Sequence, residues 1–174
     1  AIDLYKSSIS SFPNKPEAYS NLGVVYKELG NLKDAEDMFK RAIEIKSDFL
    51  DALINLAPVL KDQGKIIEAE DVILKAIKYY PKSALAHLNF ANILKALGKL
   101  HEAEISTKYA IKLNPNLTIG YINLGRILID LGKINESEEC FKKLIQLDPI
   151  NKDANYFLGR IYYSSLKFEQ AINC

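Results

Sequence analysis

Apolar residues recur along this chain at helical spacing, in pairs of neighbouring segments. In one such pair, the first segment carries apolar or small residues at i, i+3, i+4 and i+7, which places them on one helix face: Tyr19, Leu22, Gly23 and Tyr26. After a break at Gly30 and Asn31, the second segment carries its own stripe: Leu32, Ala35, Phe39, Ala42 and Ile43. The pattern predicts two helices joined by a short turn, an αα-hairpin.

The hairpin pattern returns every 34 residues. Copies begin at residues 18, 52, 86 and 120, and a partial copy begins at Ala154. Such a period indicates a repeat protein, which we expect to form a single array over residues 1–174. The array divides into the end of a partial repeat at 1–15, full repeats at 16–49, 50–83, 84–117 and 118–151, and a partial repeat at 152–174.

Glycine and proline mark the ends of the predicted helices. Glycine ends each first helix at Gly30, Gly64, Gly98 and Gly132, and proline follows the second at Pro81, Pro115 and Pro149. The predicted helices lie near 16–29, 32–46, 50–63, 66–79, 84–97, 100–113, 118–131, 134–147 and 152–165. Because one hairpin cannot bury both of its stripes, neighbouring hairpins should stack into an all-α, right-handed solenoid.

The residues that recur in register resemble the tetratricopeptide repeat over essentially the whole chain. In one copy they are Tyr19, Leu22, Gly23, Tyr26, Gly30, Ala35, Phe39 and Ala42, with Ser47 replacing the proline. The resemblance implies a protein-binding module whose first helices line a concave groove. Four departures from the pattern suggest local looseness: Thr107, Ser137, Leu144 and Leu166, which stands where the other copies have glycine.

The free face of the first helices carries an asparagine column: Asn21, Asn55, Asn89 and Asn123. Asparagine within a helix costs about 0.5 kcal/mol relative to alanine, which favours a function over simple inheritance from a duplicated ancestor. A carboxamide can bond both the N–H and the C=O of a peptide unit. A similar asparagine ladder in the O-linked N-acetylglucosamine transferase repeats binds peptide backbone, so the resemblance implies the same role here. Inheritance stays open as the alternative.

Basic residues border the asparagine column. Lys27, Lys61 and Lys95 stand one period apart, and Arg126 and Arg160 extend this edge; Asn92 is a further peptide-binding candidate. A cationic edge would favour acidic ligands, whereas lysine near a helix end also complements the helix dipole. Pro58 lies inside a first helix, where it removes one backbone hydrogen bond. The Ile54 carbonyl is then either open to a ligand or part of a local irregularity without a role.

Composition indicates a protein without catalytic or cofactor chemistry. Lysine and arginine (23) balance aspartate and glutamate (22), so charge gives no sign of nucleic-acid or membrane partners. Two cysteines, Cys140 and Cys174, are too few for a disulfide framework or a zinc site, and with no export signal we expect a cytoplasmic protein. His87 occupies a packing position of the repeat. We therefore predict no enzyme activity, no cofactor and no metal.

Two functions fit the sequence. One is a scaffold or adaptor that binds an extended peptide or partner protein along its groove; the other is the substrate-recognition arm of a larger enzyme such as a glycosyltransferase. Because neither end carries a polar capping helix, apolar faces around Tyr5 and Tyr162 should stay partly exposed. We expect end-to-end self-association to follow.

Overall fold

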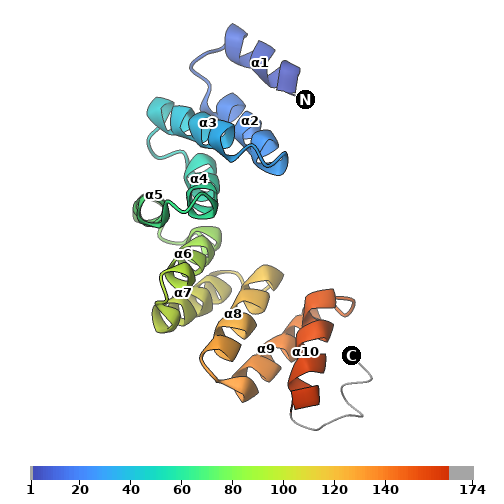
Figure 1. The fold of residues 1–174 in the computed structure, drawn as a ribbon. Helices are drawn as coiled ribbons and strands as arrows, with labels where there is room; N and C mark the ends of the chain where they lie inside the picture. The colour runs from blue at the N-terminus through green and yellow to red at the C-terminus, as the bar shows by residue number, and fades with distance from the viewer. Residues whose placement is uncertain (1, 165–174) are drawn as a thin grey trace. The chain divides into compact units, whose positions relative to one another are not determined.

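The structure is a computed structural model that describes residues 2–164 of the chain. Within that range it contains ten helices and no strand (Figure 1). The helices are α1 (Ile2–Ser11), α2 (Pro16–Glu28), α3 (Leu32–Ile45), α4 (Leu50–Asp62), α5 (Ile66–Tyr79), α6 (Ala84–Ala96), α7 (Leu100–Leu113), α8 (Thr118–Asp130), α9 (Ile134–Leu147) and α10 (Lys152–Ser164). The all-α solenoid prediction is confirmed. The bounds of α2 to α9 and the start of α10 match those predicted to within one residue, α1 was not among the predicted helices, and the predicted end at residue 165 lies outside the described residues.

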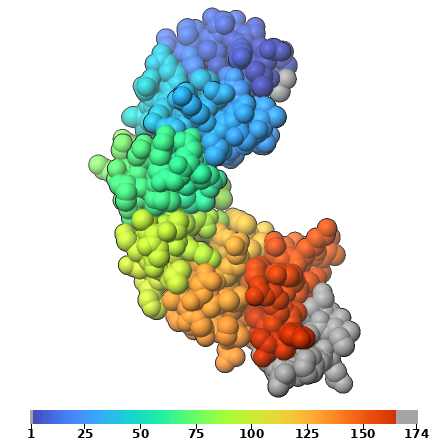
Figure 2. All heavy atoms as spheres, viewed as in Figure 1, coloured from blue at the N-terminus to red at the C-terminus, as the bar shows by residue number. Residues whose placement is uncertain are grey.

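Contacts between helices divide the chain into two compact units, residues 1–93 and 94–174. In the first unit α2 packs on α3, α3 on α4 and α4 on α5, and α2 also contacts α4. These helices follow one another as stacked bands in the space-filling view (Figure 2). In the second unit α7 packs on α8, α8 on α9 and α9 on α10. Each unit is thus built from helical hairpins, and the single array over residues 1–174 stays a prediction.

The glycines after the first helices make the turn within each hairpin. Gly30, Gly64, Gly98 and Gly132 have φ between 74 and 80°, which is the left-handed region that glycine enters without steric cost. The following residue then begins the reversal; for example, the Asn31 N–H donates to the Tyr26 carbonyl at 2.9 Å. The predicted left-handed glycine is confirmed at the ends of α2, α4, α6 and α8.

In two of the hairpins, the core depends on a glycine facing a large ring. A Cβ atom added to Gly23 would lie 2.8 Å from the Phe39 ring, and one added to Gly125 would lie 2.4 Å from the Phe141 ring. Both distances are far below van der Waals contact, so the rings exclude a side chain there. In the second copy, alanine (Ala57) takes the place of the glycine and the smaller Ile73 that of the ring.

The departures from the repeat are accommodated inside the core. Thr107 and Ser137 are fully buried, and Leu144 is buried as well. The Thr107 hydroxyl donates to the Ala103 carbonyl at 2.7 Å, and the Ser137 hydroxyl donates to the Gly125 carbonyl at 2.9 Å. Because these two buried hydroxyls are hydrogen-bonded, the expectation of local looseness at Thr107 and Ser137 was wrong. Leu166 lies outside the described residues.

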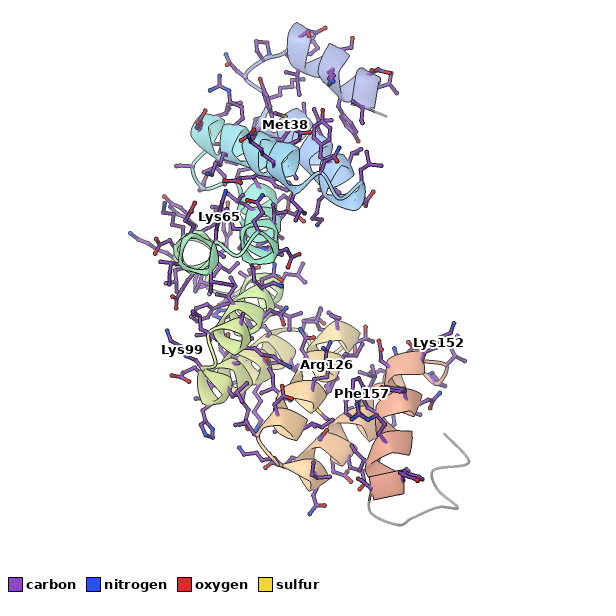
Figure 3. The ribbon with its side chains drawn as sticks, viewed as in Figure 1. Met38, Lys65, Lys99, Arg126, Lys152 and Phe157 are labelled. Carbon is purple, nitrogen blue, oxygen red and sulfur yellow. The ribbon has the colours of Figure 1, made fainter. Side chains whose placement is uncertain are left out.

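Each unit contains a buried glutamate held by two lysines. Glu36 accepts hydrogen bonds from Lys40 (2.6 Å) and Lys65 (2.7 Å). Lys65 is labelled in Figure 3. In the second unit Glu104 accepts from Lys108 (2.6 Å) and Lys133 (2.8 Å). Each glutamate thereby joins two successive repeats.

Burial by itself would raise the pKa of Glu36, but the hydrogen bonds from Lys40 and Lys65 outweigh it and hold the pKa at about 2. At Glu104, too, burial by itself would raise the pKa, but the hydrogen bonds from Lys108 and Lys133 outweigh it. The pKa of that carboxyl is therefore also lowered. Both glutamates are therefore ionised in the folded protein at neutral pH. Sequence reasoning missed these ion pairs.

The expectation of partly exposed apolar faces holds around Tyr5 but not at Tyr162. Tyr5 on α1 is half-buried, and Leu4 beside it is 76% exposed, as predicted. Tyr162 on α10 is buried, although its neighbour Tyr163 is exposed, so the prediction was wrong for Tyr162. Its ring lies in the cluster formed with Leu158 and Ile161. End-to-end association stays a prediction.

Candidate peptide-binding surface

The asparagines of the column lie in the middle of successive first helices. Asn21 is on α2, Asn55 on α4, Asn89 on α6 and Asn123 on α8. Asn21 is exposed, whereas the other three are half-buried. Asn21, Asn55 and Asn89 belong to the first unit, and Asn123 belongs to the second. Asn92, one turn beyond Asn89, is also half-buried.

Asn89 bonds a backbone carbonyl that Pro58 leaves without its helical donor. Proline has no N–H, so the carbonyl four residues earlier, that of Ile54, loses its partner within α4. The side-chain amide of Asn89 donates to this carbonyl at 2.8 Å. The Ile54 carbonyl is therefore already engaged, so the alternative in which it is open to a ligand was wrong. The other alternative, a local irregularity without a role, stays a prediction.

Asn55 is hydrogen-bonded through both ends of its carboxamide. Its oxygen accepts from Lys27 Nζ of the preceding repeat at 2.8 Å, and its nitrogen donates to the Asp51 carbonyl one turn earlier, also at 2.8 Å. Asn21, by contrast, makes no side-chain hydrogen bond within residues 2–164. Members of one column thus differ in how much of their bonding capacity the chain itself uses.

The lysines of the predicted cationic edge all have partners in their own unit. Lys27 donates to Asn55, Lys61 pairs with Asp62 at 2.6 Å, and Lys95 pairs with Asp130 at 2.7 Å. A ligand carboxylate would have to share or displace these partners, which weakens the contribution of each lysine.

The two arginines of the basic edge, unlike two of its three lysines, have no carboxylate partner among the described residues. Arg126 on α8 and Arg160 on α10 are exposed, and neither is paired with a carboxylate within the part of the chain that the structure describes. The Arg160 guanidinium lies 5.6 Å from the centre of the Tyr156 ring, within cation–π range. Phe157, which takes the asparagine place on α10, stacks on Phe141 of α9 with ring centres 5.0 Å apart (Figure 3). Both guanidinium groups therefore keep N–H donors that no carboxylate in the described part of the chain uses.

Residues that could suggest catalysis have packing roles. His87 Nε2 lies 2.9 Å from the Pro81 carbonyl, and in two other copies a tyrosine hydroxyl donates to the corresponding proline carbonyl, Tyr19 to Pro13 and Tyr121 to Pro115, each at 3.1 Å. Cys140 is buried, and burial raises its pKa to about 12, so the thiol stays protonated and unreactive. Cys174 lies outside the described residues.

Within residues 2–164, no three or more histidine, cysteine or acidic side chains lie close enough to hold a metal ion. Over the same range, no helix has the length and hydrophobicity needed to cross a membrane.

Family models described as tetratricopeptide repeat match residues 16–49, 50–83, 72–105 and 120–151, which together make up well over half of the chain. The chain belongs to the tetratricopeptide repeat family. Repeats of this family are typically non-catalytic modules that bind peptides or proteins. No curated protein sequence matches the chain.

Several solved structures share the fold at low sequence identity. YrrB, described as a tetratricopeptide repeat protein with an unusual peptide-binding site, is 22% identical with a TM-score of 0.70, covering 99% of this chain and 89% of its own. PilF of Pseudomonas aeruginosa is 23% identical with a TM-score of 0.84, covering 91% and 72%. A thermophilic tetratricopeptide repeat protein of Thermus thermophilus is 21% identical with a TM-score of 0.79, covering 94% and 87%.

Proposed function

We propose that this chain binds an extended segment of a partner protein along its first helices, as a scaffold or adaptor. The observation that carries the proposal is the asparagine column of the first unit, which retains bonding capacity on a surface that the core does not use. Asn21 is exposed and keeps both N–H groups and its oxygen. Asn89 uses one N–H on the Ile54 carbonyl. Its second N–H and its oxygen make no other bond within residues 2–164.

Backbone recognition suits the spacing of these side chains. Packed helices lie about 8–10 Å apart, and an extended chain rises about 3.3 Å per residue. Since α2 and α4 are in contact, successive asparagines could bond roughly every third residue of a bound peptide. A carboxamide bonds the peptide unit and not its side chain, so this contribution would be independent of the ligand sequence.

Selectivity for acidic ligands would come from the second unit. Arg126 and Arg160 are exposed guanidinium groups without carboxylate partners within residues 2–164. Arginine binds carboxylates through two parallel N–H donors, a geometry that lysine cannot match. Lys27, Lys61 and Lys95, which already have partners, would contribute less.

The experiment uses three disordered peptides of about 12 residues, in which serine alternates with glutamate, glutamine or lysine. Fluorescence polarisation should show binding in the order glutamate, glutamine, lysine. Asn21→Ala should weaken the glutamate and glutamine peptides by about 2- to 12-fold each, the value of one net hydrogen bond. Replacing Arg126 and Arg160 with alanine should weaken the glutamate peptide alone.

Asn135 provides the matched control, because it is an exposed asparagine on a second helix, α9. Asn135→Ala should leave every affinity unchanged. The proposal fails if no peptide binds, or if Asn21→Ala and Asn135→Ala have the same effect.

A further inference from the structure

A pocket of about 470 Å³ lies at the turn between α5 and α6, in the first unit. It is lined by Leu50 at the start of α4 and by the turn residues Tyr79, Tyr80, Pro81, Lys82 and Ser83. Two aromatic rings, a proline and a leucine give it a largely apolar lining. None of these residues belongs to the asparagine column or to the basic edge, so the pocket is a separate feature of the surface.

The two tyrosines are departures from the repeat. The places of Tyr79 and Tyr80 are filled by Ile45 and Lys46 in the preceding copy, by Leu113 and Asn114 in the next, and by Leu147 and Asp148 in the one after. The hairpin therefore folds with an aliphatic residue followed by a polar one at this turn. Tyr79 is 47% exposed, so its ring adds apolar surface facing water, which the fold does not need.

The polar groups of the pocket are also unused by the chain. The hydroxyls of Tyr79 and Tyr80 make no hydrogen bond within residues 2–164, although those of Tyr19 and Tyr121 each donate to a proline carbonyl. Lys82 has no ion pair within that range. The pocket thus combines flat apolar faces, two available hydroxyl donors and one available cation.

We propose that this pocket binds a proline-containing segment of a protein partner that carries an acidic residue beside the prolines. Proline-rich segments adopt an extended helix without internal hydrogen bonds, so their rings can pack on aromatic faces while their carbonyls accept hydrogen bonds from tyrosine hydroxyls. The acidic residue is the complement of Lys82. This inference does not rest on the proposed function of the asparagine column.

The test uses a labelled peptide of about six prolines followed by two glutamates, with two counterparts: one with lysines for the glutamates and one with serines for the prolines. Binding is followed by amide chemical shifts in NMR titrations. The proline-glutamate peptide should shift signals of residues 79–83 and bind at least about fivefold more tightly than either counterpart.

The decisive variant is Tyr79→Leu combined with Tyr80→Asn, which installs residues that another copy carries at this turn. It should keep its melting temperature and lose at least about tenfold in affinity for the proline-glutamate peptide. Tyr80→Phe, which removes only a hydroxyl, should lose about 2- to 12-fold, so a folding defect in the double variant does not end the test.

Two controls separate this site from the asparagine column. Tyr109→Lys replaces another exposed tyrosine with a basic residue, the kind that three other copies carry at this place, and it should leave the affinity unchanged. Asn21→Ala should also leave the peptide-induced shifts of residues 79–83 intact. Equal binding of the serine counterpart, unchanged affinity in both tyrosine variants, or loss of the shifts of residues 79–83 in Asn21→Ala would overturn the inference.

Discussion

The two units share the residues that pack the repeats but differ on the surface of their first helices. Gly23 faces Phe39 in the first unit as Gly125 faces Phe141 in the second, and Glu36 and Glu104 are each held by two lysines. On the first helices, the first unit instead presents asparagines, two of them bonded to the chain itself. The second presents exposed arginines.

This difference distinguishes residues that are constrained by packing in the core from residues on the surface of the first helices. Packing fixes the residues on the buried stripe, because a changed side chain there meets a close neighbour. The first-helix surface is free of that constraint, so its residues can differ between units without altering the fold. Differences between the units on this surface are therefore informative about ligands, whereas similarities in the core are informative about stability.

The largest effect is expected from adding one methyl group to the shared glycine position. Gly125→Ala places a Cβ 2.4 Å from the Phe141 ring and should destabilise the fold by about 3 kcal/mol. Gly23→Ala, at 2.8 Å from Phe39, should cost less, about 1–2 kcal/mol. Chemical denaturation measures both. Adding Phe141→Ile to Gly125→Ala recreates the Ala57 and Ile73 combination and should recover part of the loss; fully additive losses would contradict this account.

A smaller effect is expected from acid. The pKa of Glu36 is lowered in the folded state from its ordinary value of 4.5 to about 2, so its ionisation stabilises the fold above about pH 4.5 and is lost as pH falls toward 2. The contribution at neutral pH is on the order of 2 kcal/mol. Glu36→Gln should remove it and flatten the decline of stability between pH 4.5 and 2. Glu104→Gln should act in the same direction, since the pKa of that carboxyl is also lowered.

Asn89 provides a test that applies only to the first unit. Asn89→Ala removes the donor to the Ile54 carbonyl and should destabilise the fold by about 1 kcal/mol. Pro58→Ala restores an N–H within α4 that can bond the same carbonyl, so in that background Asn89→Ala should cost less. Denaturant melts of the four proteins give this coupling. Equal costs in both backgrounds would show that the Asn89 bond does not compensate for Pro58.

The smallest effect on stability is expected from the arginines of the second unit. Arg126→Ala should change the free energy of unfolding by less than about 0.5 kcal/mol, because the side chain is exposed and has no carboxylate partner within residues 2–164. Arg160→Ala should lose at most about 1 kcal/mol, from its contact with Tyr156. Thermal melts would show this. A loss above about 2 kcal/mol would mean that these residues support the fold instead of a ligand.

Most of the fold could be predicted from the sequence because its determinants are local and repeated. Gly30 fixes the turn of its hairpin wherever the copy occurs, and the stripe around Leu22 fixes the buried face. The contacts between copies could not be predicted so well, because they depend on which side chains meet across about 30 residues. The Lys65 bond to Glu36 and the Asn89 bond to Ile54 are of this kind.

The sequence nevertheless contains a pattern that indicates the bonds of Glu36 and Glu104 to lysines of the next repeat. Glutamate recurs at Glu36, Glu70, Glu104 and Glu138, and lysine at Lys65, Lys99 and Lys133, always 29 residues after a glutamate. The bond from Asn89 to the Ile54 carbonyl, which Pro58 leaves without a helical donor, has no comparable sequence pattern. A carbonyl freed by proline can be bonded by water, by a ligand or by a neighbouring side chain, and only the folded structure shows that the Asn89 amide bonds it.

The glycine facing a ring has a consequence for how such a chain can be recombined. Gly23 and Phe39 lie within one repeat, so exchanging only the first helix for that of the second copy would set an alanine against the ring. By contrast, the glutamate and lysine that join successive repeats within each unit are the same residue types at the same places of the repeat: Glu36 with Lys65, and Glu104 with Lys133. Exchanges of whole repeats, with crossover points in the turns between repeats, should therefore be tolerated better than chimaeras cut at the glycine turn inside a hairpin, which should be less stable.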